Sequence, residues 1–341
     1  MKLLVFEFAT ATGNTDPSLT SEGHAMLEAI LDDLRAFKPH YLVPNKFNQI
    51  NMGTGRVSVE GDLFEWLNNN INDYDACLPI APEESNILHD LTSIIEKNDV
   101  DVLGSNSHAL KITTNKFKMY NELKKKVPVI KTEKIFFNHD LGESKYKTIF
   151  QDGTPKVLKP ADGVSCSGVM VLNSYNELIE ALNGIKHFTM LPYAILQEYI
   201  AGTNVSVSLL SNGKTALPLS LNSQEIVLDS RKINYNGGKI PINHNLADVA
   251  KNMAKTAVES IEGIKGYVGV DMIIDNDGAV HLVEINSRLT TPYIALRKII
   301  NFNLGQSLIN AVNGELPPQP RLNGEAKFYK EGQTLRVSVL K

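Results

Sequence analysis

Three oxygen-bearing side chains lie close together in a β-hairpin predicted over residues 267–288. Asp277-Gly278 is a strong signal for a two-residue turn, and a turn there places Asp271 directly opposite Glu284. Two carboxylates that face each other repel unless a positive charge lies between them. Asn286 shares their face, because alternate residues of a strand point to the same side. Carboxylate and amide oxygens are the ligands that Mg²⁺ prefers, so the hairpin predicts a magnesium site at these three residues.

An exposed edge strand with incidental acids is the alternative explanation of the pair. The residues around it are apolar, among them Val268, Val270, Leu282 and Ile285. Natural edge strands are usually blunted by charged residues, so this composition favours a buried strand. Burial raises the cost of leaving two carboxylates without a cation, which strengthens the prediction of a metal site.

A glycine–serine segment at residues 161–168 (ADGVSCSG) could cover phosphate groups. It connects two predicted strands, 156–160 and 169–172. Small residues let backbone N–H groups approach phosphate oxygens closely. The loops of Walker and dinucleotide sites run from a strand to a helix, whereas a loop between two strands favours a hairpin flap that closes over a nucleotide. An ordinary polar turn is the alternative.

Two lysines could meet phosphate oxygens as point charges. Lys159 lies in the apolar strand before the flap, where an ammonium group needs an anionic partner. Lys116 begins a lysine-rich helix predicted over residues 115–126, with Thr113 or Thr114 as its N-cap. For Lys116 a solvated helix face is the alternative.

Two arginines could hold a carboxylate or an acyl-phosphate in a bidentate fork. Arg288 continues the face of the hairpin that carries Glu284. Arg231 lies in a glycine-rich polar segment, residues 229–243, which we expect to form a mobile loop. A solvated surface position is the alternative for Arg231.

Two short segments that follow predicted strands could contact ligands. Gln197-Glu198-Tyr199-Ile200 ends a strand before Gly202, and backbone groups in such a hinge could pair with the edge of an adenine ring. Glu83 and Glu84 follow a strand at 75–80, at the kind of carboxyl end where ligands gather in open α/β sheets. These acids could bind a cationic amine. The alternative is an acid pair at a helix N-terminus, where the helix dipole favours it.

The first part of the chain predicts an α/β domain over residues 1–105. Strands at 3–8 and 75–80 alternate with helices at 19–37 and 86–97. Alternation of this kind favours an open parallel sheet.

The remainder predicts two α+β lobes, over residues 106–195 and 196–341. The first lobe holds the lysine-rich helix, the flap and a helix at 175–183. The strands expected at or beyond its end are 195–200, 205–210, 216–221, 267–274 and 280–285, framed by helices at 246–261 and 294–313. The fold class is therefore α/β followed by α+β.

Composition excludes several classes of function. The 341 residues carry 34 basic and 38 acidic side chains, a formal net charge of -4, which is no electrostatic footprint for nucleic acid. No apolar run approaches the roughly 18 residues of a membrane span. The two cysteines, Cys77 and Cys166, have neither zinc-ligand nor disulfide-framework spacing, so we expect a reducing cytoplasm. The eight histidines show no metal or Ser-His-Asp spacing, and a homo-oligomer is left open.

The order of these segments resembles the ATP-grasp superfamily. The resemblance covers about residues 105–310 and is carried by Lys116, KVLKPADGVSCSGV (156–169), LQEYIAGTNVSV (196–207), GVDMIID (269–275) and VEINSR (283–288). It implies ATP held between two α+β lobes, with an N-terminal α/β domain before them.

The same resemblance implies a role for each matching residue. Adenine is expected at the backbone of Glu198 and Ile200, within the hinge 197–200, and Mg²⁺ or Mn²⁺ at the three hairpin ligands. The residues expected at ATP and its phosphates are Lys116, Lys159, Gly163, Ser165, Ser167 and Gly168.

Two positions depart from the family pattern. Many members carry a Glu two residues past the hinge glycine, where it contacts ribose, and here that position is Asn204. Many peptide-ligase members carry an Arg two residues before the metal-binding Asp, and here that position is Gly269, opposite Asn286 in the predicted register. An oxyanion is then expected to be stabilised by Arg288, Arg231 or another residue.

The activity that the resemblance implies is ATP-dependent ligation of a carboxylate to an amine. A substrate carboxylate is phosphorylated, with metal and lysines such as Lys159 neutralising charge on the transferring group. An amine then attacks the acyl-phosphate, which leaves an amide, ADP and phosphate.

Further segments narrow the resemblance to the branch of tyramine–L-glutamate ligases, which implies joining the γ-carboxyl group of glutamate to tyramine in methanofuran biosynthesis. They are FEFATATG (6–13), LPIAPEESNIL (78–88), YNGGKIPINH (235–244) and INSRLTTPYIALR (285–297). One alternative is another amino-acid ligase of the superfamily, as in pyrrolysine biosynthesis. The other is a nucleotide-binding protein without turnover, against which the complete metal set argues.

Overall fold

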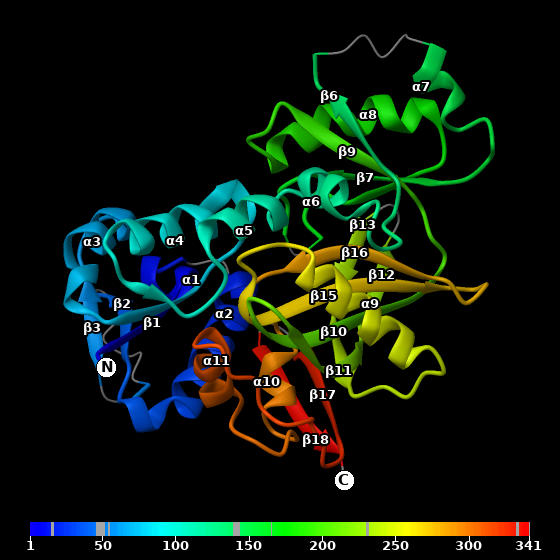
Figure 1. Cartoon of the computed structure of the whole chain (residues 1–341). Helices are drawn as coiled ribbons and strands as arrows, with labels where there is room; N and C mark the ends of the chain where they lie inside the picture. The colour runs from blue at the N-terminus through cyan, green and yellow to red at the C-terminus, as the bar shows by residue number, and fades with distance from the viewer. Residues whose placement is uncertain are drawn as a thin grey trace.

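The computed structural model describes residues 1–14, 17–45, 52–53, 55–138, 144–164, 166–229, 232–331 and 334–340. Within these ranges the strands form four sheets, and no helix is long and apolar enough to cross a membrane. Figure 1 shows the N-terminal sheet beside a central sheet, with a smaller lobe above both.

The N-terminal sheet is parallel, with strand order β3-β2-β1-β4-β5. Its strands are β1 (Leu3–Glu7), β2 (His40–Pro44), β3 (Arg56–Val59), β4 (Ala76–Ile80) and β5 (Asp101–Val102). The accompanying helices are α1 (Phe8–Thr12), α2 (Pro17–Asp33), α3 (Leu63–Asn70), α4 (Ile87–Lys97) and α5 (Ser107–Thr113), with the 3₁₀ turns η1 (Arg35–Phe37), η2 (Ile71–Asp73) and η3 (Glu84–Asn86). Every residue of β1 and β4 is buried, as expected of central parallel strands that are covered on both faces. The predicted open α/β sheet is confirmed.

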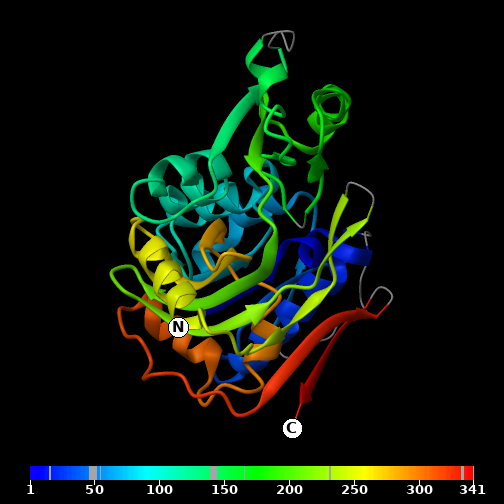
Figure 2. The same ribbon diagram turned by 90° about the vertical axis from the view of Figure 1, so that its right-hand side faces the viewer.

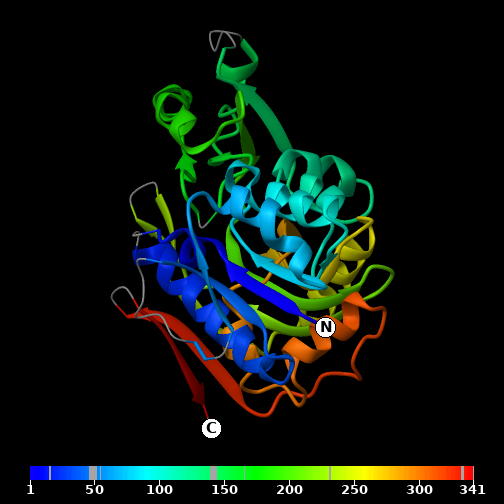
Figure 3. The same ribbon diagram turned by 90° about the vertical axis from the view of Figure 1, so that its left-hand side faces the viewer.

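The small lobe is built on an antiparallel six-stranded sheet of order β12-β13-β8-β7-β9-β6. Its strands are β6 (Thr132–Phe136), β7 (Lys156–Pro160), β8 (Met170–Leu172), β9 (Tyr193–Glu198), β12 (Ile226–Asp229) and β13 (Lys232–Tyr235). The helices nearby are α6 (Lys116–Leu123), α7 (Ser144–Thr148) and α8 (Tyr175–Ile185), with the 3₁₀ turn η4 (Lys186–Phe188). The lobe boundary expected at 195/196 falls inside β9, which pairs with both β6 and β7. Figures 2 and 3 show the yellow-green β12–β13 hairpin reaching from this sheet to the blue N-terminal helices.

The rest of the chain adds two antiparallel sheets. The central sheet has the order β11-β10-β15-β16 and the last sheet the order β14-β17-β18. Their strands are β10 (Gly202–Asn212), β11 (Ala216–Ser223), β14 (Gly237–Ile240), β15 (Lys265–Asp275), β16 (Val280–Asn286), β17 (Glu325–Glu331) and β18 (Thr334–Leu340). The helices of this part are α9 (Ala247–Glu259), α10 (Tyr293–Leu296) and α11 (Leu304–Val312).

Two expected elements are wrong. The single helix expected over residues 294–313 is broken into α10 and α11, and Asn303 caps α11 by accepting a hydrogen bond from the backbone N–H of Gln306. The loop expected over residues 229–243 contributes β13 and β14 instead. Its glycines reflect close backbone packing, since a Cβ on Gly237 would lie 2.2 Å from the carbonyl oxygen of Phe328.

The N-cap expected for the lysine-rich helix is also wrong. Thr113 and Thr114 belong to the end of α5, and their hydroxyls donate to the carbonyls of Ala109 and Leu110. The cap of α6 is Asn115, whose side chain accepts hydrogen bonds from two backbone N–H groups of the first turn. The Asn115 cap therefore fixes Lys116 as the first residue of α6.

The β15–β16 hairpin has the predicted pairing at the carboxylates. Asp271 pairs with Glu284, and Gly269 pairs with Asn286. β15 is an interior strand of the central sheet, whereas β16, which carries Glu284, is an edge strand of it. The segment at 128–130 covers part of that edge, because Leu282 exchanges backbone hydrogen bonds with Pro128 and Ile130. The pairing confirms the register that the sequence predicts, while the expected interior position holds only for the strand of Asp271.

The turn that joins the two strands differs from the prediction. It holds three residues, 276–278, because the N–H of Asp275 donates to the carbonyl of Ala279. Gly278 has φ +85°, as in the common three-residue hairpin loop that ends in a left-handed residue. A register shift just beyond Asp271 offsets the longer turn and restores the predicted pairing at the site.

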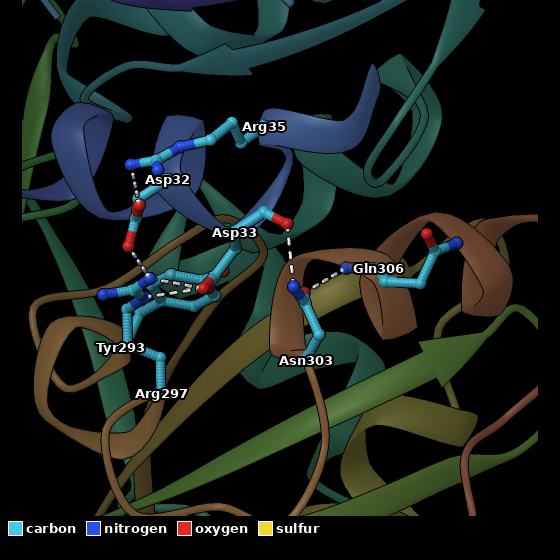
Figure 4. A network of polar contacts seen from close by, with 7 residues as sticks. All are labelled: Asp32, Asp33, Arg35, Tyr293, Arg297, Asn303 and Gln306. Atoms are coloured by element: carbon cyan, nitrogen blue, oxygen red, sulfur yellow. Dashed lines mark hydrogen bonds and ion pairs between the residues drawn. The ribbon is translucent and has the colours of Figure 1, made fainter. Parts of the chain in front are cut away.

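The N-terminal domain and the C-terminal part share one hydrophobic core. Buried residues of β1, β2, β4 and α2 pack there with buried residues from the range 289–311. Figure 4 shows polar contacts at the same junction, where Asn303 donates to the backbone carbonyl of Asp33 at 2.8 Å. The small lobe has a core of its own between its sheet and α8. The junction therefore fixes the N-terminal domain against the central sheet.

Candidate active site

A cleft of about 1070 Å³ lies where the N-terminal domain, the small lobe and the central sheet meet. The carboxyl ends of β1 and β4 open into it, as the topology of an open parallel sheet predicts. The flap side of β7, the end of β9 and the faces of β10, β15 and β16 form the opposite wall. Its volume exceeds that of a typical single-ligand pocket, so more than one substrate fits.

The facing carboxylates lie in this cleft, and a lysine meets them. Lys116 Nζ lies 3.0 Å from Glu284 Oε2 and also donates to the backbone carbonyl of Gly163 at 2.6 Å. Asp271 accepts from neutral groups instead, Gln224 Nε2 at 2.9 Å and Asn286 Nδ2 at 3.1 Å. The positive charge that the pair requires is thus supplied by the start of α6.

The two carboxylates differ in acidity because only one has lysines close by. Burial, followed by the charge of Glu284, raises the pKa of Asp271 above its ordinary value. Burial would raise the pKa of Glu284 too, but Lys116 and Lys159 hold that pKa below its ordinary value. Glu284 therefore stays ionised readily, whereas an added cation would favour the ionised form of Asp271.

The donor set fits a hard divalent metal. Asp271, Glu284 and the amide of Asn286 present only oxygen ligands for it, with the amide of Gln224 beside them. In the described ranges no three His, Cys, Asp or Glu side chains come together to make a metal cage. A site with two carboxylates is the kind that Mg²⁺ completes with waters and substrate phosphates.

Lys159 is buried in β7 and lines the cleft. Burial lowers the pKa of Lys159 to about 8, although Glu284 acts in the opposite direction. Its ammonium makes no hydrogen bond or ion pair with any residue that the structure describes. A buried ammonium without a contact partner is suited to an anionic ligand.

The flap residues are placed differently from one another. Gly163 and Ser167 line the cleft, and Ser165 lies outside the described residues. Gly168 is absent from the lining; it has φ +70°, and a Cβ there would lie 2.8 Å from the ring of Phe188. Gly168 therefore serves the turn, where its conformation and the close ring both require glycine.

The hinge residues line the cleft at the end of β9. Glu198, Tyr199 and Ile200 border it, and Gln197 is buried with its side-chain amide donating to Thr132 Oγ1 at 2.7 Å. Asn204 borders it from β10. The expected nucleotide-contacting positions are thus gathered along one wall.

The expected substrate residues divide into one paired and one unpaired acid. Arg288 lines the cleft, and its Nε donates to Glu83 Oε2 at 2.7 Å. Glu83 is buried and is not among the lining residues. Glu84 lines the cleft half-buried, and burial, followed by the charge of Asp162, raises its pKa. Arg231 lies outside the described residues.

The glycine that replaces the usual arginine has a steric explanation. A Cβ on Gly269 would lie 2.8 Å from Cγ2 of Thr290 and 3.1 Å from its Oγ1. Thr290 therefore occupies the space that a larger side chain at position 269 would need. Of the arginines that the structure describes, only Arg288 borders the cleft.

Several lining residues have no signal in the sequence. Gln224 follows the end of β11, and its contact with Asp271 depends on the pairing of three strands. Tyr235 and Thr291 line the cleft and lie in the segments 235–244 and 285–297, where the sequence assigns neither of them a role, and Lys330 lies outside every predicted motif. Only the assembled sheets bring them to the site.

Comparison with known proteins agrees with this architecture. The model of the ATP-grasp domain matches residues 113–292, and that of the pre ATP-grasp 3 domain matches residues 38–110. The chain is 34% identical to the tyramine–L-glutamate ligase of Methanocaldococcus jannaschii, covering 98% of this chain and 94% of that protein. The enzyme of the same name from Methanocaldococcus fervens is 33% identical, with 98% and 99% covered. A crystal structure from Archaeoglobus fulgidus, of a protein assigned to the ATP-grasp superfamily, has a TM-score of 0.73 at 25% identity, with both chains fully covered.

The chain belongs to the ATP-grasp superfamily, with a pre-ATP-grasp domain before its ATP-grasp domain. It is an ATP-dependent carboxylate–amine ligase, similar over nearly its whole length to the tyramine–L-glutamate ligases. The fold class expected from the sequence is confirmed.

Proposed function

We propose that the chain joins the γ-carboxyl group of L-glutamate to tyramine and releases ADP and phosphate, a step of methanofuran biosynthesis. The observation that carries the proposal is that one cleft gathers two sets of residues. Lys116, Lys159 and the hinge line it together with Arg288 and Glu84, and the Asp271–Glu284 pair borders the same cleft. The similarity to two ligases that are named for these substrates supports the choice of acid and amine.

ATP occupies the wall formed by β7, β9 and β10. The backbone of Glu198 and Ile200 pairs with adenine, and Asn204 takes the ribose side. Lys116 and Lys159 neutralise the phosphates, while Gly163 and Ser167 of the flap border them. Asp271, Glu284 and Asn286 would hold Mg²⁺ or Mn²⁺, which would neutralise charge on the transferring phosphoryl group.

The carboxylate substrate binds at Arg288, where a guanidinium fork suits both the carboxylate and the acyl-phosphate made from it. Phosphorylation makes the carboxyl carbon electrophilic. The ammonium group loses a proton to water, the free amine nitrogen then attacks that carbon, and phosphate leaves with the bridging oxygen while the nitrogen gives up its second proton. Arg288 then faces the oxyanion of the tetrahedral state. Its ion pair with Glu83 keeps the guanidinium in place for both steps.

The amine binds at the end of the N-terminal sheet. Glu84 accepts the ammonium group, because its carboxylate borders the cleft without a cationic contact in the described residues. The apolar side chains nearby suit a phenyl ring. Those that line the cleft here are Phe8, Met26, Ile80, Pro82 and Ile87.

The test is ADP release with Mg²⁺ and ATP in the presence of L-glutamate plus tyramine, compared with each substrate omitted singly. Release that needs both, together with the mass of glutamyl-tyramine, supports the proposal, and fragmentation distinguishes γ from α linkage. Release with other acid and amine pairs, but not this one, would point to another amino-acid ligase. Binding of ATP without release under any pair would point to a nucleotide-binding protein without turnover.

A further inference from the structure

The substrate side of the cleft holds a second cation besides Arg288. Among the described lining residues the cations are Lys116, Lys159, Arg288 and Lys330. The proposed function assigns the first two to ATP. Lys330 lies on β17, and its backbone N–H donates to the carbonyl of Asn236 at 3.2 Å. A substrate with two carboxylates needs two cationic contacts, and Lys330 is the one that the mechanism leaves unused.

Lys330 forms an ion pair with an acid that is itself held in place. Its Nζ lies 2.7 Å from Glu22 Oε1, and Thr291 Oγ1 donates to Glu22 Oε2 at 3.0 Å. Glu22 belongs to α2 and Thr291 to the segment between Arg288 and α10, so three separate parts of the chain converge. Both members of the pair line the cleft.

This ion pair has unused hydrogen-bonding capacity on both sides. A lysine ammonium has three donors, and a carboxylate has about four lone-pair sites. The contacts to Glu22 and from Thr291 use one donor of Lys330 and two acceptor sites of Glu22. The side chains are 32% and 19% exposed, so a ligand in the cleft can reach them without breaking the pair.

We propose that the Glu22–Lys330 pair binds the α-amino and α-carboxyl groups of the acid substrate, an inference that rests on the proposed function. Lys330 donates to the α-carboxylate and Glu22 accepts from the α-ammonium, so the four charges form an alternating ring. Thr291 is three residues from Arg288, and their Cα atoms are at most about 10 Å apart. The path of the chain thus keeps the Glu22–Lys330 pair near Arg288, and the proposal places the γ-carboxylate of a short dicarboxylic amino acid at that guanidinium.

The simpler explanation is that the pair only connects α2 to β17. An ion pair of this exposure contributes little to stability as a connection. The two explanations differ in what happens when one charged group is removed from the substrate instead of the protein. If the pair binds the substrate, the change in KM caused by substituting Glu22 or Lys330 depends on whether the acid carries the α-amino or α-carboxyl group. If the pair only connects α2 to β17, it does not.

The experiment pairs each substitution with a substrate that lacks its partner group. The variants are Lys330→Met and Glu22→Gln, and the acids are L-glutamate, 4-aminobutanoate without the α-carboxylate, and glutarate without the α-amino group. Lys330→Met should raise KM for L-glutamate by roughly 10- to 100-fold, the size of a charge-assisted hydrogen bond, and change that for 4-aminobutanoate less than about threefold. Glu22→Gln should affect L-glutamate and 4-aminobutanoate but leave glutarate nearly unchanged.

Competition gives the same comparison where an analogue turns over too slowly to measure. The inhibition constants of 4-aminobutanoate and glutarate against L-glutamate then replace KM. Lys327→Met is the matched control, because Lys327 lies on the same strand in an ion pair with Glu225 and does not line the cleft. The melting temperature of each variant separates loss of binding from loss of fold, and the double variant E22Q/K330M removes both charges together.

Equal increases in KM for all three acids, or no increase for L-glutamate, would overturn the subsite. The proposed function fails by a different result, namely wild-type protein that shows no ADP release dependent on L-glutamate. Wild-type turnover of L-glutamate with an unaltered Lys330→Met variant would leave the reaction standing and remove only the Glu22–Lys330 pair from it.

Discussion

At the junction between α2 and α10, Arg297 donates to both Asp32 and Asp33, and the hydroxyl of Tyr293 donates to Asp33 as well (Figure 4). In the cleft, by contrast, Asp271 faces Glu284 with only amide donors of its own. Lys159 lies buried nearby without a hydrogen bond in the described residues. At the junction the charged groups pair with one another, whereas in the cleft Lys159 lacks a partner within the described ranges and the two carboxylates face each other.

The difference separates charges that hold the fold from charges that serve a reaction. In the junction cluster (Asp32, Asp33, Tyr293 and Arg297) each buried charge has a partner, which is what burial requires. In the cleft cluster (Lys116, Lys159, Asp271 and Glu284) like charges are kept close, at a cost in stability that a metal and phosphates would offset. The cleft variants should therefore lose activity without losing stability, and the junction variants the reverse.

The largest effect is expected from Asp271→Asn and Glu284→Gln. Each removes one of the two carboxylates proposed to hold the metal, so ATP turnover should fall by about 1000-fold or more, in the range that loss of transition-state charge stabilisation produces. Asp271→Asn also removes a repulsion, so its melting temperature without metal should equal or exceed that of the wild type. ADP release and thermal unfolding measure the two effects.

The neighbouring buried serines of β10 provide a control for packing alone. Ser208→Ala changes a residue that contacts Tyr267 and Asn222 but no carboxylate, and should retain most activity. Full turnover in either carboxylate variant would remove the metal assignment, and a large loss of melting temperature in Asp271→Asn would show that the cleft cluster stabilises the fold after all.

The opposite result is expected from Arg297→Met at the junction. Removing one partner of a buried ion pair leaves the other uncompensated, so the free energy of unfolding should fall by about 3–5 kcal/mol. The turnover of the folded fraction should stay near that of the wild type. Chemical unfolding, with activity measured well below the transition, distinguishes the two.

Low pH should reduce the difference in the free energy of unfolding between wild type and Arg297→Met. The hydrogen bond from Arg297 lowers the pKa of Asp32 below its ordinary value of 3.8. A lowered pKa stabilises the fold above the ordinary value and ceases to do so as the pH falls through the folded one. The advantage of wild type over Arg297→Met should therefore narrow below about pH 4. Arg35→Met, which removes only an exposed partner of Asp32, is the control and should change stability by less than about 1 kcal/mol.

The cleft could be predicted from the sequence where its contacts are local. Asp271 and Glu284 are joined by one short turn, so the pattern of the hairpin sets their pairing even though the turn has one residue more than expected. Lys159 could be identified because a lysine in an apolar strand is chemically unusual. The same holds for the open N-terminal sheet, whose strands and helices alternate within short range.

Contacts between distant segments could not be predicted in this way. The pairing of Arg288 with Glu83 joins the central sheet to the N-terminal domain, and that of Glu22 with Lys330 joins the two ends of the chain. In the junction cluster, Tyr293 and Arg297 lie in the quoted segment 285–297, but nothing in the sequence pairs them with Asp32 and Asp33, which are ordinary residues on a helix surface until α10 covers them. The loop predicted over residues 229–243 is wrong because glycine is favoured both in loops and where two backbones pack closely, and the sequence does not distinguish the two.

Lys159 gives a smaller effect that depends on pH. Its pKa is about 8, so its ammonium is charged below that pH and loses its charge above it. ATP affinity should therefore fall by about tenfold between pH 7 and 9.5, as one charge-assisted hydrogen bond is lost. Lys159→Arg stays charged throughout and should show no such fall. Parallel pH profiles for the two proteins would exclude Lys159 as the titrating group.

Glu83 and Glu84 are neighbours in the chain, but only one of them has a cationic partner in the described part of the chain, so they allow the two kinds of charge to be compared side by side. Glu83 is paired like the junction acids but holds a cleft residue, and Glu84 borders the cleft without a cation. Glu83→Gln should lower kcat by about 2- to 10-fold, the size of one hydrogen bond, with little change in KM for tyramine. Glu84→Gln should instead raise KM for tyramine by a similar factor and leave kcat and KM for ATP nearly unchanged.

If Glu83→Gln lowers only the melting temperature, Glu83 belongs with the charges that hold the fold. If neither variant changes KM for tyramine, the amine is not anchored by this acid pair, and its ammonium must be sought elsewhere along the cleft.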